Sequence, residues 1–130
     1  MQEKIAKLKS IKMLFVEDEE DLATIISDTL NKLQANFDTA ANGQIALDLF
    51  KTKNDYDLIV TDINMPVMNG LELIKNVREV NTEIPVIIMS AHTEPEYIKS
   101  AEELGVDNYL LKPFDFIKFI NLVYQLDFNK

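Results

Sequence analysis

The chain has 130 residues, a length that allows one domain and leaves no room for a second. Hydrophobic residues make up 47% of it and charged residues 27%, which is typical of a globular fold that buries a sizeable core. The 22 acidic residues outnumber the 13 lysines and arginines. The resulting net charge of −9 argues against direct binding to nucleic acid, because it repels the phosphate backbone.

Several classes of protein are excluded by what the sequence lacks. It contains no cysteine, which excludes disulfides, thiolate metal sites and cysteine nucleophiles. No apolar run approaches the ~20 residues that a membrane-spanning helix needs. Residues 1–10 lack the apolar segment of a signal peptide, so we expect a cytoplasmic protein that does not bind membranes.

Short apolar runs alternate with longer amphipathic stretches along the chain. The apolar runs predict strands at residues 13–16, 36–40, 58–60, 86–89 and 108–111. Apolar residues at helical spacing predict helices at about residues 22–33, 45–50, 71–77, 94–104 and 114–126. Strands that alternate with helices imply βαβ crossovers, and hence an α/β fold: a doubly wound, five-stranded parallel sheet with helices on both faces.

The character of each run indicates its place in the sheet. Residues 13–16, 58–60 and 86–89 are apolar throughout, as expected for central strands that are buried on both faces. Residues 36–40 alternate between apolar and polar side chains, and the run at residues 108–111 is short and partly polar. Both patterns favour strands at the two edges of the sheet. These assignments agree with strand order 2-1-3-4-5, the flavodoxin-like arrangement.

Polar side chains follow the strands at the edge of the sheet where ligands of open parallel sheets bind. Glu17 and Asp18 follow the first strand, Asp62 the third and Ser90 the fourth, and Lys112 precedes the last helix. Each residue alone has a plainer interpretation, such as a loop carboxylate or a solvated lysine. Their convergence from four strands favours a site instead.

This set of groups is typical of metal-assisted phosphoryl chemistry. Crowded carboxylates repel one another unless a cation lies among them, and oxygen-only ligands suit a hard ion such as Mg²⁺. A carboxylate can attack phosphorus and form an aspartyl phosphate. A metal ion and a lysine would then neutralise charge on the transferring group, while a hydroxyl donates to its oxygen.

Four blocks of sequence carry a resemblance to a known family. They are VEDEE, DLIVTDINMPVMNG, IIMSAH and NYLLKPF, in this order. Together they resemble the receiver domains of two-component response regulators, in particular the chemotaxis receivers. The resemblance covers residues 11–126 and leaves residues 1–10 as an N-terminal extension and residues 127–130 as a tail.

The resemblance implies a role for each acidic position. Asp62 would be phosphorylated, and its carboxylate would also bind the metal ion. Asp18 would bind Mg²⁺ directly and Glu17, which replaces the aspartate of many members, mainly through water. Asn64 would offer its backbone carbonyl to the metal. Asn64 and His92 lie where side chains of the family influence the lifetime of the phosphate, which stays open.

The resemblance also implies how the domain switches. Ser90, where threonine is commoner, and Lys112 would contact the phosphoryl group and assist catalysis. Ser90 would move toward the phosphate, and Tyr109 would turn inward behind it. The face made by the fourth helix, the fifth strand and the fifth helix of the family would then change shape. The family also implies a cis peptide between Lys112 and Pro113.

The expected function is that of a signalling switch rather than an enzyme. A histidine kinase or a histidine phosphotransfer protein would donate the phosphoryl group to Asp62 in a Mg²⁺-dependent reaction. The chain would assist its own phosphorylation and dephosphorylation and turn over no separate substrate. The switched face would control an output protein or an attached effector domain, and whether the chain acts alone or belongs to a longer regulator stays open.

The last predicted helix carries two apolar stripes. The first, suited to the core, consists of Phe116, Phe119, Val123 and Leu126. The second consists of Ile117, Ile120 and Tyr124 and is rotated by about 100°. We interpret the second stripe as an interaction face for dimerisation or for an effector, and the alternative is a locally wide contact with the core.

Two other functions fit the chain less well. A phosphatase of the haloacid-dehalogenase type also attacks through an aspartate. In that family the aspartate belongs to an Asp-x-Asp motif after the first strand, and the fold carries a cap module. Here Asp62 follows the third strand, and no residues remain for a cap. A flavin-binding protein of the same fold needs a phosphate cradle after the first strand, where Glu17 and Asp18 would repel a phosphate.

Overall fold

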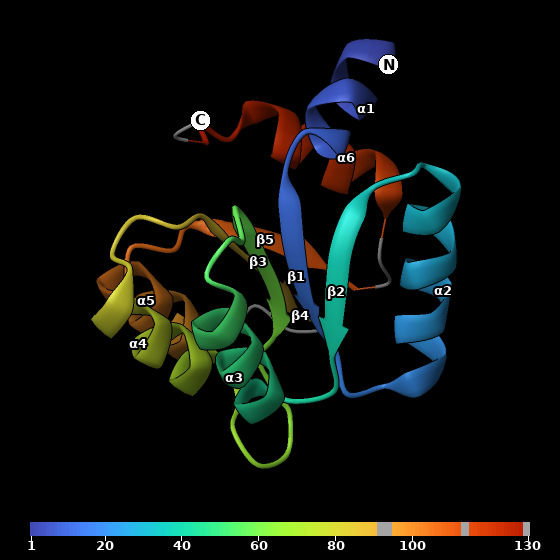
Figure 1. Cartoon of the computed structure of the whole chain (residues 1–130). Helices are drawn as coiled ribbons and strands as arrows, with labels where there is room; N and C mark the ends of the chain where they lie inside the picture. The colour runs from blue at the N-terminus through green and yellow to red at the C-terminus, as the bar shows by residue number, and fades with distance from the viewer. Residues whose placement is uncertain (91–94, 113–114, 129–130) are drawn as a thin grey trace.

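A computed structural model of the chain describes residues 1–90, 95–112 and 115–128. Its helices are α1 (Gln2–Lys9), α2 (Glu20–Lys32), α3 (Gly43–Lys53), α4 (Gly70–Val80), α5 (Pro95–Glu103) and α6 (Phe116–Gln125). Its strands are β1 (Lys12–Val16), β2 (Asn36–Ala40), β3 (Leu58–Asp62), β4 (Val86–Ser90) and β5 (Asn108–Leu111). The five strands form one parallel sheet in the order β2-β1-β3-β4-β5, with helices on both faces (Figure 1). The predicted fold and strand order are confirmed.

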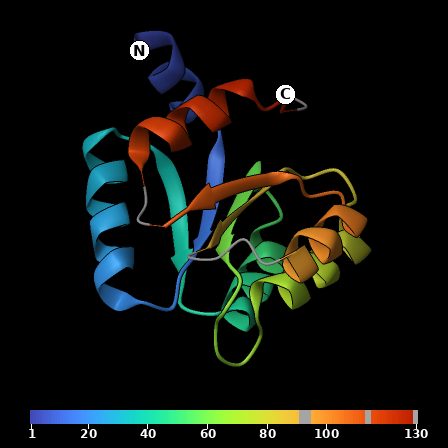
Figure 2. The ribbon, with the colours of Figure 1, turned by 180° about the vertical axis from the view of Figure 1, so that it is seen from behind.

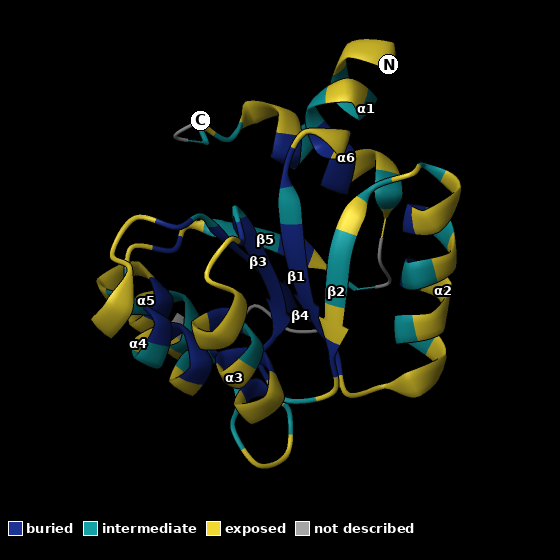
Figure 3. Cartoon of the chain, viewed as in Figure 1, coloured by how far each residue is buried: buried dark blue, intermediate teal, exposed yellow. Residues whose placement is uncertain are grey.

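The sheet is buried on both faces at its centre. Every residue of β3 and β4 is buried, whereas in β2 at one edge only Ala40 is buried and β5 at the other edge is only partly covered (Figure 3). Successive side chains of a strand point to opposite faces, so the strands feed two separate clusters. In β1, for example, Leu14 and Val16 join one cluster, while Met13 and Phe15 join the other.

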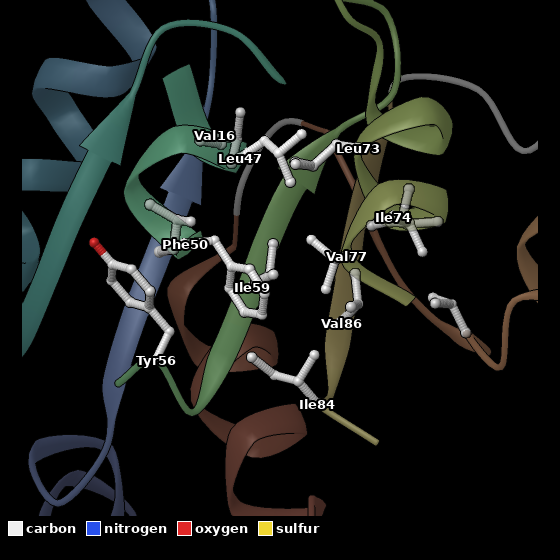
Figure 4. Packing of buried hydrophobic residues seen from close by; sticks show 14 of the residues in the cluster. Val16, Leu47, Phe50, Tyr56, Ile59, Leu73, Ile74, Val77, Ile84 and Val86 are labelled. Carbon is white, nitrogen blue, oxygen red and sulfur yellow. The ribbon is translucent and has the colours of Figure 1, made fainter. Parts of the chain in front are cut away.

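Different helices close the two clusters. The first cluster lies between the sheet and α3, α4 and α5, and Figure 4 shows Phe50 of α3 and Leu73 and Val77 of α4 packed against Ile59 of β3. The second lies between the sheet and α2 and α6, where Phe15 and Phe119 meet edge to face at 5.5 Å between ring centroids. The sheet therefore forms the middle of a three-layer fold (Figure 2).

Helix α1 is not predicted by the sequence analysis. It packs beside α6 at the end of the sheet opposite the predicted site (Figures 1 and 2). Leu8 of α1 and the following Ile11 are fully buried in the second cluster. Eight residues are too few to show a helical repeat clearly, and so short a helix is marginal without packing partners.

The prediction that Ile117, Ile120 and Tyr124 form one interaction face is wrong for Ile120. Ile120 is only 4% exposed and belongs to the second cluster, because the buried arc of α6 is wide enough to include it. Tyr124 lies against the lysines of α1. Ile117 is 56% exposed and Tyr124 is 39% exposed. The alternative of a wide core contact therefore holds for Ile120.

No helix among the described residues is long and apolar enough to cross a membrane.

The loop between β3 and α4 is packed tightly around a glycine. The backbone N–H of Gly70 donates to the carbonyl of Ile63 at 2.8 Å. A Cβ atom at residue 70 would lie 2.0 Å from the backbone oxygen of Asp62, which is closer than atoms can approach. Gly105, which follows α5, has a φ of +78° but open space around it.

We expect Gly70→Ala to lower the free energy of unfolding by about 2–3 kcal/mol, because the backbone around Asp62 must move to accommodate the methyl group. Gly105→Ala is the control, with an expected loss of about 1 kcal/mol from its left-handed backbone alone. Urea unfolding of both variants measures the difference. Equal losses would contradict the packing argument.

A partly buried hydrogen bond joins β2 to the segment before β3. The Tyr56 hydroxyl donates to Asp38, whose carboxylate also pairs with Lys53 at 2.9 Å. Burial raises the pKa of Asp38, but the hydrogen bond from Tyr56 and the pair with Lys53 outweigh it, so the pKa lies below its usual range. A depressed pKa stabilises the fold above the usual aspartate pKa of about 4, and this stabilisation is lost as the pH falls through the folded-state value.

We therefore expect Tyr56→Phe to cost about 1 kcal/mol at pH 7, and this cost to shrink as the pH falls below about 4. Denaturant unfolding at pH 7 and pH 3 measures it. The same substitution in an Asp38→Asn background is the control and should cost less at pH 7. A cost that is independent of pH and of residue 38 would show that the hydroxyl contributes through other contacts.

Candidate functional site

The predicted site residues that the structure describes meet at the carboxyl ends of the strands. Glu17 and Asp18 directly follow β1, and Asp62 and Ser90 are the last residues of β3 and β4. Lys112 directly follows β5. Parallel strands in register bring these ends to one edge of the sheet, as the sequence analysis expects.

Three carboxylates form the centre of the site. Oxygen atoms of Glu17, Asp18 and Asp62 all lie within 4.8 Å of one another. Glu17 and Asp62 are buried, whereas Asp18 is exposed. The group is therefore open to solvent on the Asp18 side and closed by protein behind it.

A single ammonium group joins two of these carboxylates. Lys112 Nζ lies 2.7 Å from Asp62 Oδ2 and 2.9 Å from Glu17 Oε1. The other oxygen of Asp62 accepts the backbone N–H of Ile63 at 2.7 Å. Glu17 Oε2 accepts the backbone N–H of Glu19 at 3.2 Å. Both buried carboxylates are thus held in orientation by one ion pair and one backbone N–H each.

The protonation equilibria of Glu17 and Lys112 reflect this arrangement. Burial raises the pKa of Glu17, and the negative charge of Asp62 adds to the rise, while Lys112 and the N–H of Glu19 oppose it. Burial alone would lower the pKa of Lys112, but its contacts with Asp62 and Glu17 outweigh this and raise it. Lys112 is therefore held as a cation at neutral pH.

The residues present fit a hard divalent cation. Three carboxylates face one ammonium group, so the site keeps an excess of negative charge. All its potential ligand atoms among the described residues are oxygens, which suits Mg²⁺ better than a softer metal. Asp18, Asp62 and Glu17 are the residues that could hold it, directly or through water.

The loop that follows Asp62 is braced on two sides. Asn64 lies in this loop with an exposed side chain. Besides the bond from Gly70 to Ile63, the N–H of Gly43 at the start of α3 donates to the carbonyl of Met68 at 3.1 Å. Val67 adopts a φ of 70°, which a β-branched residue rarely does. Contacts on both sides therefore hold a strained backbone next to the site.

The two predicted switch residues lie on neighbouring strands. Ser90 is buried at the end of β4, and its carbonyl accepts the N–H of Lys112 at 2.9 Å. Tyr109 is half-buried on β5, and its hydroxyl donates to the carbonyl of Ile98 in α5 at 3.2 Å. Tyr109 therefore links β5 to α5 in this structure.

Two predictions lie outside the described residues. The cis peptide involves Pro113, and His92 falls within residues 91–94. Both stay predictions.

The sequence analysis missed the ion pair between Glu17 and Lys112 and the N–H groups of Glu19 and Ile63. A backbone donor leaves no signal in the side-chain pattern. The pairing of residues 17 and 112 could have been inferred only from the convergence of the strand ends, which gives proximity but not partners.

Comparison with known proteins agrees with this geometry. The response regulator receiver domain family matches residues 13–124. The chain is 38% identical over 109 residues to chemotaxis protein CheY-3 of Vibrio cholerae, covering 82% of this chain and 83% of that protein. It is 36% identical over 104 residues to sporulation initiation phosphotransferase F of Bacillus subtilis, covering 80% and 83%.

Solved structures and longer relatives extend the comparison. The crystal structure of a CheX-CheY-BeF3-Mg complex from Borrelia burgdorferi matches with a TM-score of 0.79 and 27% identity, covering 87% of this chain and 86% of that one. The chain spans only 19% of the two-component response regulator ARR10 of Arabidopsis thaliana, to which it is 35% identical over 104 residues. With the family matched over most of its length, the chain belongs to the response regulator receiver domains.

Proposed function

We propose that Asp62 accepts a phosphoryl group in a Mg²⁺-dependent reaction and that the product switches the face formed by α5, β5 and α6. These helices are the fourth and fifth of the family, since α1 precedes the matched region. The observation that carries the proposal is the Asp62 carboxylate, which lies beside two further acids and is oriented by Lys112 and the N–H of Ile63.

The chemistry follows from these contacts. A carboxylate oxygen of Asp62 attacks the phosphorus of a phosphohistidine, and the phosphorus–nitrogen bond breaks with its electron pair leaving on the imidazole. Lys112 stays charged and neutralises the phosphoryl oxygens. A bound Mg²⁺ would supply further charge stabilisation between the acids and the phosphoryl group. The hydroxyl of Ser90, at the end of β4, is the donor expected to meet a phosphoryl oxygen.

The comparisons support the expected ion and partners. The Borrelia relative is crystallised with Mg and BeF3 and in complex with CheX. The Bacillus relative is named a phosphotransferase of sporulation. For this chain we infer a histidine kinase or a phosphotransfer protein as donor, and an output protein or effector domain as target. We expect no turnover of a separate substrate, and the cytoplasm stays the predicted compartment.

The face that would switch offers room for a partner. A cavity of about 330 Å³ lies between β5 and α6, lined by Tyr109, Leu110, Leu111, Lys118, Asn121, Leu122 and Gln125. Leu111 and Ile117 are more than half exposed on the same two elements. Because Tyr109 also contacts α5, a movement of this side chain would change the face. Binding of a second copy of the chain here stays a prediction.

The phosphorylation test uses intact mass after incubation with acetyl phosphate and Mg²⁺. We expect one phosphoryl adduct on the wild type and none on Asp62→Asn or without Mg²⁺. Asp55→Asn, which changes the same kind of residue away from the site, should still be modified. Because the adduct could hydrolyse before its mass is measured, binding of beryllofluoride to the same site is measured as well. If the wild type shows neither the adduct nor this binding, the proposed function is wrong.

The metal ion can be tested separately. We expect Asp18→Asn to weaken Mg²⁺ binding at least tenfold, because it removes the one exposed carboxylate of the three. Isothermal titration calorimetry of the unphosphorylated protein measures this. Asp48→Asn on α3 is the matched control, because it changes the net charge equally. Asp48 accepts a hydrogen bond from Gln44 and lies away from the site. Equal affinities in both variants would show that Asp18 does not bind the ion.

A further inference from the structure

Helix α1 is tied to the C-terminal half of α6 by two lysines. Lys4 Nζ donates to Asn121 Oδ1 at 2.7 Å. Lys7 Nζ donates to the carbonyls of Tyr124 and Leu126, which belong to the last turn and the C-cap of α6. These carbonyls have no partner within the helix, so Lys7 supplies the cap and a favourable charge at the negative end of α6.

Aromatic rings complete the contact. The ammonium groups of Lys4 and Lys7 lie over the ring of Tyr124, at 5.7 and 5.6 Å from its centroid. Lys7 also lies 5.4 Å from the ring centroid of Phe128. Leu8, on the same short helix, is fully buried in the cluster that contains Phe119 and Val123 of α6.

These contacts decide whether α1 is folded. A helix of eight residues is unstable alone in water, since nucleation costs more than so few hydrogen bonds return. The helical state of α1 therefore depends on packing against α6. Loss of these contacts would therefore favour the unfolded state of α1.

The opposite end of α6 is linked to the phosphorylation site. Lys112, whose ammonium group binds Asp62, lies only four residues before Phe116, the first residue of α6. The side chain of Asp115 caps that end by accepting the N–H groups of Ile117 and Lys118. Lys112 is therefore close in sequence to one end of a helix whose other end is held by α1.

We propose that α1 is a regulatory latch, which docks on α6 and favours the unphosphorylated arrangement of the site. The structure shows the docked α1 together with Lys112 shared between Glu17 and Asp62. A phosphoryl group on Asp62 would take Lys112 as its partner and shift α6 away from the position to which α1 binds. Since linkage is reciprocal, phosphorylation loosens α1, and loosening α1 favours the phosphorylated form. This inference rests on the proposed function, but α1 lies outside the region that the family matches.

The test compares two lysines of α1 in the full chain. Lys7→Met removes the bonds to the α6 carbonyls and keeps an apolar stem of similar length. Lys9→Met is the matched control, because Lys9 Nζ instead meets Gln34 beyond α2. Affinity for beryllofluoride in the presence of Mg²⁺ is measured by fluorine NMR titration. We expect Lys7→Met to bind beryllofluoride three- to tenfold more tightly than the wild type, and Lys9→Met to bind within twofold of it.

A second measurement needs no variant. Hydrogen exchange of the backbone amides of α1 in the wild type is followed by mass spectrometry with and without beryllofluoride and Mg²⁺. We expect exchange in α1 to become at least threefold faster when beryllofluoride is bound. Helix α3, on the other face of the sheet, is the internal control and should not change.

The outcomes are distinct. If the wild type does not bind beryllofluoride, the proposed function itself fails. If it binds, but Lys7→Met and Lys9→Met have the same affinity and exchange in α1 is unchanged, α1 is only a structural support and the latch is wrong. Weaker binding by Lys7→Met would also overturn the proposal, since it would show that docking of α1 favours the phosphorylated form. Should Lys7→Met fail to fold, the exchange measurement on the wild type decides alone.

Discussion

The ion pairs of Lys112 are the interaction on which the rest of the site depends. Three carboxylates meet at one edge of the sheet because Glu17 and Asp18 follow β1 and Asp62 ends the neighbouring parallel strand β3, and like charges that are partly buried repel one another. Lys112 offsets part of that repulsion by binding Asp62 and Glu17 at once. Its own elevated pKa, which its contacts produce against the effect of burial, keeps the amine charged while it does so.

The same lysine joins the chemistry of the site to the shape of the domain. It follows β5, the strand that carries Tyr109, and it precedes α6, the helix that carries one wall of the cavity on the switch face. Any group that competes for its ammonium therefore acts on both neighbouring elements. The proposed switch needs no long chain of contacts, because one residue belongs to the site and borders the proposed output face.

The packing of α6 gives this helix an unusual set of neighbours. It covers the second cluster with Phe119, Ile120 and Val123, borders the cavity with β5, and binds α1 at its C-terminal end. Asp115 caps the first turn of this helix, and Lys7 of α1 binds the carbonyls at its end. The proposal that α1 belongs to the switching unit rests on these contacts.

The sequence by itself determined the architecture and the composition of the site. The apolar runs at 13–16, 58–60 and 86–89 predicted central strands, and residues that follow parallel strands lie at one edge of the sheet, so Asp18, Asp62 and Lys112 were predictable as neighbours. Only the tertiary structure decided which of them pair, that Glu17 is buried against Lys112, and that Ile120 faces the core. It alone also revealed α1, because a helix this short forms through contacts with Asn121, Tyr124 and the core, which no local pattern records.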